Sequence, residues 1–411
     1  MSGNNEPFRD FDFARDLPAV KRIWQEVGWV DDAEGIAQLD HFFNCGRTRV
    51  ATIAGEAECS VHTVPGTFNQ RGRVLKLCAV TAVTTSRIAR GHAFAKRLTA
   101  EQLLHARRNG AQMAALGMFD QGFYDLLGFG TGAYDNEFTF DPDLLQVNHR
   151  VPTPERFGVD DVERLCAAMK DRLPAHGGVA LDPVPLLCAE LGFHTHSFGL
   201  GYSGKDGKVS HFVWLNPEGE RGPYRVLFMA YQSTDQLLEL LGLLKSLADQ
   251  VYSCILREPP ELQLQSLLAR PLRHQALTKN GKHQNHIRSL AWWQARILDL
   301  PAVVSTFDDL ANTIAFNLVL DDPLDAFAQE EDEPLGGEYV VHLGADASAV
   351  RGRDPQLPQL KASINALTRL LIGVASAEQL ALTDEFTAPP DLLATLSQAL
   401  RMPKPVPGLD F

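Results

Sequence analysis

Residues 77–110 read LCAVTAVTTSRIARGHAFAKRLTAEQLLHARRNG, and this stretch decides the fold. Its first part, through Thr85, is apolar and rich in Val and Thr, residues that favour a largely buried β-strand. Residues 94–108 are rich in Ala, Leu, Lys, Arg and Gln, which rank high in helix propensity. Asn109-Gly110 is typical of the C-terminal end of a helix. The pattern therefore predicts a strand, a basic turn and a helix in succession.

The turn, SRIARGHA at residues 86–93, predicts an anion site. The start of a helix leaves backbone N–H groups unpaired, and its dipole favours negative charge. The glycine at residue 91 lets a phosphate approach the backbone closely. Generic phosphate sites share these features, so the turn alone does not identify the ligand.

The downstream sequence narrows the choice. A second apolar strand, AALGM at residues 114–118, leads to QGFYDLLGFG at residues 121–130. In this order the pieces resemble the GNAT (Gcn5-related) N-acetyltransferases, whose pyrophosphate loop reads roughly R/Q-x-x-G-x-G/A after a Val-rich strand. Gly91 and Ala93 match the last two positions, while Ile88 stands where the family has Arg or Gln. The resemblance implies acetyl-CoA as co-substrate.

The resemblance also implies how the cofactor is held. Backbone groups of Thr81 and Val83 in the strand would pair with the pantetheine arm. The amides around Arg90, Gly91, His92 and Ala93 would hold the pyrophosphate. The side chains of Arg87 and Arg90 could pair with phosphate oxygens or be merely solvated.

Acetyl transfer to an amine needs a base for the ammonium and an acid for the leaving thiolate. Tyr124 matches the GNAT tyrosine that protonates the thiolate; the alternative is a tyrosine that only packs against the sheet. In the GNAT family that the chain resembles, many members carry a glutamate as base on the strand before the loop, but here that strand, residues 75–85, has no carboxylate. The base must therefore lie elsewhere, and Asp120 is one alternative, although a loop or cap carboxylate is its simpler interpretation.

The whole chain has 411 residues, which is enough for two or three domains. In their order, the parts resemble the Eis (enhanced intracellular survival) family of acetyltransferases, also known for acetylating aminoglycosides. The resemblance implies an α+β protein with tandem GNAT folds: a catalytic domain at residues 1–147, a degenerate GNAT-like domain at 148–289 and a sterol-carrier-protein-like domain at 290–411. It further implies a homo-oligomer, a hexamer or trimer.

In Eis-like enzymes the C-terminal carboxylate is understood to enter the active site. The resemblance assigns the α-carboxylate of Phe411 as base and Asp410 as a contact to the substrate amine; the alternative is a frayed polar tail. Asp31 and Asp32 lie where GNATs place substrate-facing loops, although an ordinary solvated turn explains them equally well. Together these residues predict a cationic amine substrate.

Composition bounds the remaining possibilities. A net charge of −13 disfavours general nucleic-acid binding and favours cationic partners such as polyamines or lysine-bearing peptides. We expect no membrane span, because the sequence has no apolar run of 18 residues. We expect a cytoplasmic protein, because the N-terminus is polar and acidic and the six cysteines are scattered without a CxxC pair. We expect no metal, because no carboxylate or cysteine set accompanies either histidine pair (His194 and His196; His283 and His286). An acyl-CoA sensor without catalysis and a lipid-carrying protein remain as alternative functions.

Overall fold

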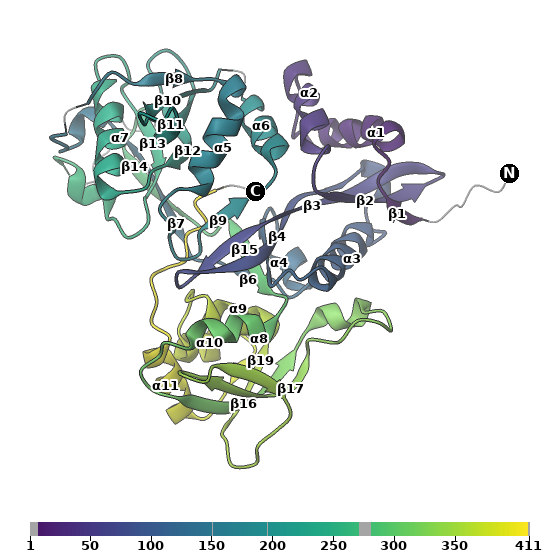
Figure 1. Cartoon of the computed structure of the whole chain (residues 1–411). Coiled ribbons are helices and arrows are strands. Elements are labelled where there is room, and N and C mark those ends of the chain that lie inside the picture. Colours follow the sequence, from purple (N-terminus) through teal and green to yellow (C-terminus); the bar gives the residue numbers. More distant parts are fainter. Residues whose placement is uncertain (1–6, 150, 195, 271–280, 410–411) are drawn as a thin grey trace.

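The computed structural model describes residues 7–149, 151–194, 196–270 and 281–409. Within them the chain forms three units, each built on a β-sheet with helices packed against it (Figure 1). The architecture is mixed α+β, as predicted. In the described ranges, no helix is both long and apolar enough to cross a bilayer.

The first sheet has the strand order β1-β2-β3-β4-β5-β15-β6, with β9 paired to the far end of β3. Its strands are β1 (Phe8–Asp10), β2 (Arg47–Ile53), β3 (Glu56–Gln70), β4 (Arg73–Thr85), β5 (Met113–Gly117), β6 (Gly130–Thr131), β9 (Val179–Leu181) and β15 (Trp293–Ile297). The helices α1 (Phe13–Glu26) and α2 (Ala33–Phe42) lie on one face, and α3 (Phe94–Arg108) and α4 (Gln121–Asp125) on the other (Figure 1).

The predicted strand, turn and helix at residues 77–110 are β4, a 3-10 turn and α3. Side chains of β4 pack on both faces: Ala79 and Ala82 belong to the cluster under α1 and α2, and Val80 and Val83 to the cluster under α3. Burial on both faces explains why the strand is apolar without strict alternation.

The middle sheet has the order β14-β7-β13-β12-β11-β10-β8. Its strands are β7 (Asp135–Phe140), β8 (Glu155–Phe157), β10 (Phe198–Ser203), β11 (Val209–Pro217), β12 (Tyr224–Ala230), β13 (Cys254–Arg257) and β14 (His286–Leu290). Its helices are α5 (Val162–Lys170), α6 (Val184–Gly192) and α7 (Thr234–Ser246). The apolar run of α7 buries Leu240, Leu241 and Leu244 against this sheet.

The third unit has a sheet of order β18-β17-β16-β19-β20. Its strands are β16 (Ile314–Asp321), β17 (Gly337–Leu343), β18 (Ser348–Arg351), β19 (Gln359–Ser363) and β20 (Phe386–Thr387). Its helices are α8 (Leu300–Val304), α9 (Ile364–Leu371), α10 (Ala377–Thr383) and α11 (Pro390–Ala399). The long β3–β4 hairpin of the first unit reaches it, where Gln70 Nε2 donates to Leu371 O at 2.7 Å.

Three strands join sheets on the other side of the expected domain boundaries. β9, at residues 179–181, pairs with β3 in the first sheet, although it lies in the domain expected at residues 148–289. β7, at residues 135–140, pairs with β13 and β14 in the middle sheet, although we expected the first domain to run to residue 147. β15, at residues 293–297, pairs with β5 and β6 in the first sheet, although it was expected in the third domain. The first sheet is therefore completed by a strand that follows the whole middle unit in sequence.

Candidate active site

The splay between β4 and β5 opens the site. The two parallel strands pair from Leu77 with Met113 to Val80 with Leu116, and β4 continues to Thr85 beyond the last of these pairs. On its other side, β3 pairs His62 with Ala82 and Thr63 with Val80, which leaves Thr81 as the extra residue of a β-bulge. On the side that faces β5, the main-chain groups of β4 between Thr81 and Thr85 therefore border an opening instead of a neighbouring strand.

The turn after β4 ends at the start of α3. A 3-10 turn (Arg87–Ala89) comes first, and then Gly91 and Ala93 take positive φ angles of 84° and 57°. Ala93 is the N-cap residue, and the first α3 amide to bond backwards is that of Arg97, to Ala93 O at 3.1 Å. The amides of residues 94–96 are therefore free to meet an anion.

These elements enclose a cavity of about 630 Å³. Four predicted cofactor residues line it: Val83, Arg90, Gly91 and Ala93. Its other lining residues include four aromatic side chains that the sequence did not single out for binding: Trp29, Phe94, Phe119 and Phe123. The sequence could have indicated a binding role for Trp29, because this tryptophan lies in the acidic loop before α2.

Arg87 and His92, two further predicted cofactor residues, form hydrogen bonds with other parts of the protein. The backbone N–H of Arg87 donates to Glu26 Oε2 at 3.1 Å, and its Nη2 donates to Glu26 O at 3.2 Å, so α1 holds this arginine. The hydrogen bond from Arg87 is the main cause that lowers the pKa of Glu26. The backbone N–H of His92, which is the group expected at the pyrophosphate, donates to Ala89 O at 3.5 Å within its own turn. Ile88 is exposed.

Tyr124 lies in α4, whose N-cap Asp120 accepts from Gly122 N and Phe123 N. The tyrosine is 2% exposed, and its ring packs against Phe119 and Phe123, with centroids 5.8 and 4.9 Å away. Burial, aided by the charge of Asp120, raises the pKa of Tyr124 well above its usual range, so its phenol is protonated at neutral pH. The role of Asp120 as a helix cap agrees with its simpler interpretation.

Of the predicted substrate residues, the structure describes Asp31 and Asp32. Asp32 is the N-cap of α2 and accepts from Gly35 N at 2.6 Å, and Asp31 is exposed beside it. Asp410 and Phe411 lie outside the described residues. No group of three or more metal-ligating side chains occurs among the residues that the structure describes.

The described end of the chain, residues 403–409, leaves the third unit and runs between the β3–β4 hairpin and the middle unit (Figure 1). Val406 N donates to His176 O at 2.9 Å, and Val179 N donates to Pro407 O at 3.0 Å, so this tail lies along the segment before β9. Leu409 is buried in the cluster between α5 and the middle sheet.

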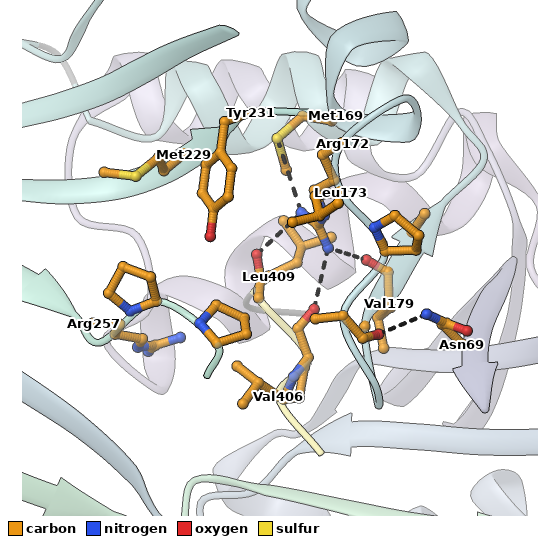
Figure 2. Close-up of a pocket in the computed structure, with 18 of the residues that line it drawn as sticks. Asn69, Met169, Arg172, Leu173, Val179, Met229, Tyr231, Arg257, Val406 and Leu409 are labelled. Atoms are coloured by element: carbon orange, nitrogen blue, oxygen red, sulfur yellow. Dashed lines mark hydrogen bonds between the residues drawn. The ribbon is translucent and has the colours of Figure 1, made fainter. Parts of the chain in front are cut away.

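Arg172 fastens this tail. As Figure 2 shows, its guanidinium lies beside the last described residues; Nη1 donates to Gly408 O at 3.1 Å, and Nη2 donates to Pro407 O at 3.1 Å and to Val179 O. Burial lowers the pKa of Arg172 to about 10. The tail also borders a cavity of about 330 Å³, into which the hydroxyl of Tyr231 points (Figure 2). The sequence around Arg172 did not predict its contact with the tail.

Comparison with known proteins places the chain among acetyltransferase folds. Residues 14–132 match the acetyltransferase (GNAT) domain family. The whole chain is similar to a probable N-acyltransferase of Enterococcus faecalis V583 (TM-score 0.80, 16% identity, 98% of this chain and 99% of that chain). It is also similar to Eis1 of Mycobacterium abscessus (0.77, 15%, 99% and 100%) and a GCN5-related N-acetyltransferase of Kribbella flavida (0.74, 18%, 98% and 98%).

No curated relative matches the chain by sequence. The match at residues 14–132 covers β4, the turn and α4, which are the elements that form the 630 Å³ cavity. The chain therefore carries a GNAT acetyltransferase domain and is an enzyme of the N-acetyltransferase class.

Proposed function

We propose that the chain transfers the acetyl group of acetyl-CoA to primary amines of cationic small molecules, aminoglycoside-like or polyamine, or to lysine side chains. One observation carries the proposal: the amides at the start of α3 open into a cavity whose lining residues Phe119 and Phe123 pack against the buried, protonated Tyr124. The N-terminus of a helix suits the cofactor's pyrophosphate, and the unpaired edge of β4 suits its pantetheine arm.

The proposed reaction is a direct transfer. The amine nitrogen attacks the thioester carbon, the C–S bond breaks, and Tyr124 gives its proton to the departing thiolate. The presence of Trp29 in the cavity lining supports a cationic acceptor, because aromatic rings attract ammonium groups. The net charge of −13 favours the encounter with such a substrate.

We propose Phe411 as the base through its α-carboxylate, and Asp410 as an amine contact. Support comes from the course of the tail, which Arg172, His176 and Val179 hold as far as Leu409 between the first and middle units. An unperturbed α-carboxyl group has a pKa of about 3.3–3.7, so it would act by holding the amine and accepting its proton through water.

Tyr124→Phe tests the proposed acid. We expect kcat for amine acetylation to fall about 100-fold, because a positioned acid contributes about 10²–10⁴-fold, while the KM for acetyl-CoA changes little. Tyr134→Phe is the matched control, since Tyr134 is 65% exposed. The assay follows thiol release from acetyl-CoA with a panel of aminoglycosides, polyamines and lysine peptides.

The panel also tests the substrate class. Acetylation of cationic amines by the wild-type protein, lost in Tyr124→Phe and kept in Tyr134→Phe, is the expected result. Wild-type kcat in Tyr124→Phe would contradict the assignment of the acid, and thiol release with none of the amines would contradict the substrate class.

A further inference from the structure

The segment that carries Tyr124 is held by side chains from far along the chain. The short helix α4 and the turn that follows it, residues 121–131, contact β15 and α9, which lie at residues 293–297 and 364–371. A five-residue helix has little stability of its own, so its orientation depends on these partners.

Asn365, the second residue of α9, makes the most direct connection. Its Nδ2 donates to Asp125 O at 3.1 Å and to Phe129 O at 2.9 Å. Asp125 is the last residue of α4, and Phe129 closes the next turn by donating its N–H to Tyr124 O at 3.3 Å. One side-chain amide thus spans the turn that begins at Tyr124.

Two side chains of β15 complete the support. Gln294 Nε2 donates to Asp125 Oδ1 at 2.7 Å, and Gln294 is 0% exposed. Arg296 donates through Nη1 to Leu127 O, and its Nη2 lies 2.7 Å from Asp322 Oδ2 in a buried ion pair. Asp322 belongs to the third unit. That unit therefore holds Arg296 in place, and Arg296 holds the turn after α4 through Leu127 O.

The glycines of this turn allow the close approach. A Cβ atom on Gly128 would lie 2.6 Å from Ile364 Cγ2, and one on Gly130 would lie 2.6 Å from Asn365 O. Side chains at these positions would push α9 away from α4. The turn is therefore shaped to receive α9 and not only to end α4.

We propose that the third unit positions the catalytic tyrosine, with Asn365 as the positioning residue that sets α4 against the cofactor cavity. This inference rests on the proposed function of Tyr124. It gives the third unit a role in catalysis that needs no ligand of its own. A small displacement of a reacting group can cost about 10²-fold in rate, so the effect is measurable.

Asn365→Ala tests the inference. We expect kcat to fall about 10-fold or more, the KM for acetyl-CoA to stay within about twofold, and the amides of Leu127, Gly128 and Phe129 to exchange hydrogen faster. In the Tyr124→Phe background, Asn365→Ala should lower kcat no further, because the group that it positions is gone.

Asn317→Ala is the matched control. Asn317 is 3% exposed in β16, and its Nδ2 also donates to two main-chain oxygens, Asp354 O at 2.7 Å and Leu357 O at 3.0 Å, both within the third unit. It should reduce stability comparably while kcat and exchange at Leu127–Phe129 remain as in the wild type.

The outcomes separate this inference from the proposed function. An unchanged kcat in Asn365→Ala, or the same fractional loss with and without Tyr124, would overturn the positioning role while leaving the acid in place. Wild-type kcat in Tyr124→Phe would instead overturn the assignment of the acid, and the exchange measurement would still report whether Asn365 holds the turn.

Discussion

The imidazole of His62 is enclosed between α2 and β3. It is 0% exposed, its Nδ1 lies 2.8 Å from Thr48 Oγ1, and the rings of Phe42 and Phe43 pack against it. Burial disfavours the charged imidazolium and lowers the pKa of His62 to about 3. The folded protein therefore keeps this histidine neutral.

His62 should make the fold sensitive to acid. In the unfolded chain it titrates near pH 6.5, so between that pH and about 3 only the unfolded state binds the proton, and the free energy of unfolding decreases as the pH falls. The loss from pH 6.5 to 5 is about 2 kcal/mol. His62→Gln removes this term, which urea unfolding at pH 7 and pH 5 measures.

The exposed His41 supplies the control for His62. His41→Gln should keep the acid sensitivity of the wild type. If His62→Gln lost as much stability between pH 7 and 5 as the wild type does, the burial of a neutral imidazole would not be the cause.

Gly128 controls how α4 docks on α9. Its φ angle is 80°, and an added Cβ would meet Ile364 Cγ2 at 2.6 Å and Arg296 Nη1 at 2.9 Å. Gly128→Ala should cost about 1–3 kcal/mol in the free energy of unfolding, through backbone strain and overpacking together. Thermal unfolding and the rate of acetyl transfer would both report the change.

Gly207 is a control that separates the cost of backbone strain at a positive φ angle from the cost of overpacking. Its φ angle is 78°, and nothing lies within 4 Å of an added Cβ. Gly207→Ala should therefore cost less than Gly128→Ala and leave the transfer rate unchanged. Equal losses in the two variants would show that the contact with α9 contributes nothing.

Arg172 should act on the reaction through the tail. Arg172→Met removes the donors to Pro407 O and Gly408 O, so the tail should be digested faster by a carboxypeptidase and kcat should fall about 10-fold. Arg164→Met is the control, because Arg164 lies in α5, shortly before Arg172, and is bonded to Asp161 and Ser203 instead of the tail.

A shortened chain distinguishes an effect of Arg172 through the tail from a general effect of Arg172 on folding. In a chain shortened by residues 410 and 411, Arg172→Met should produce no further loss of kcat, because the proposed base is already removed. The same fractional loss in the full and shortened chains would contradict the tail as the route of the effect.

Local patterns predicted the catalytic elements well. The Val- and Thr-rich run became β4, the helix formers became α3, and the glycine turn between them has the positive φ angles that an anion site uses. Trp29 and Arg172 were not predicted, because each acquires its role from segments distant in sequence. Arg87 was expected at the phosphates, but its partner Glu26 lies 61 residues away and could not be inferred.

The order of strands in the sheets was harder to predict than the strands themselves. The run WQARI at residues 293–297 lies in the domain expected at residues 290–411, and its local pattern does not say which sheet receives it. It joins β5 and β6, where Trp293, Ala295 and Ile297 are all 0% exposed. Pairing across such separations depends on tertiary packing, which a local pattern does not encode.

The buried pair Arg296–Asp322 links the first sheet to the third unit. Its atoms are 2.7 Å apart, and both side chains are at most 1% exposed. Asp322→Asn should cost about 3–5 kcal/mol in the free energy of unfolding, because it leaves the guanidinium uncompensated. Urea unfolding measures the loss, and transfer kinetics show whether α4 is displaced.

The paired replacement Arg296→Met with Asp322→Leu tests whether charge is the cause. It removes both ions and should recover much of the lost stability, yet the transfer rate should stay low because Leu127 O has lost its donor. Full recovery of the rate would contradict the link between the third unit and the catalytic turn.

A crystal structure of the protein with bound CoA tests the central proposition most directly. The account predicts the diphosphate within hydrogen-bond distance of the amides from Gly91 to Lys96, the pantetheine along β4 between Thr81 and Thr85, and the thiol next to Tyr124. A diphosphate bound elsewhere on the molecule, or a thiol remote from Tyr124, would contradict it.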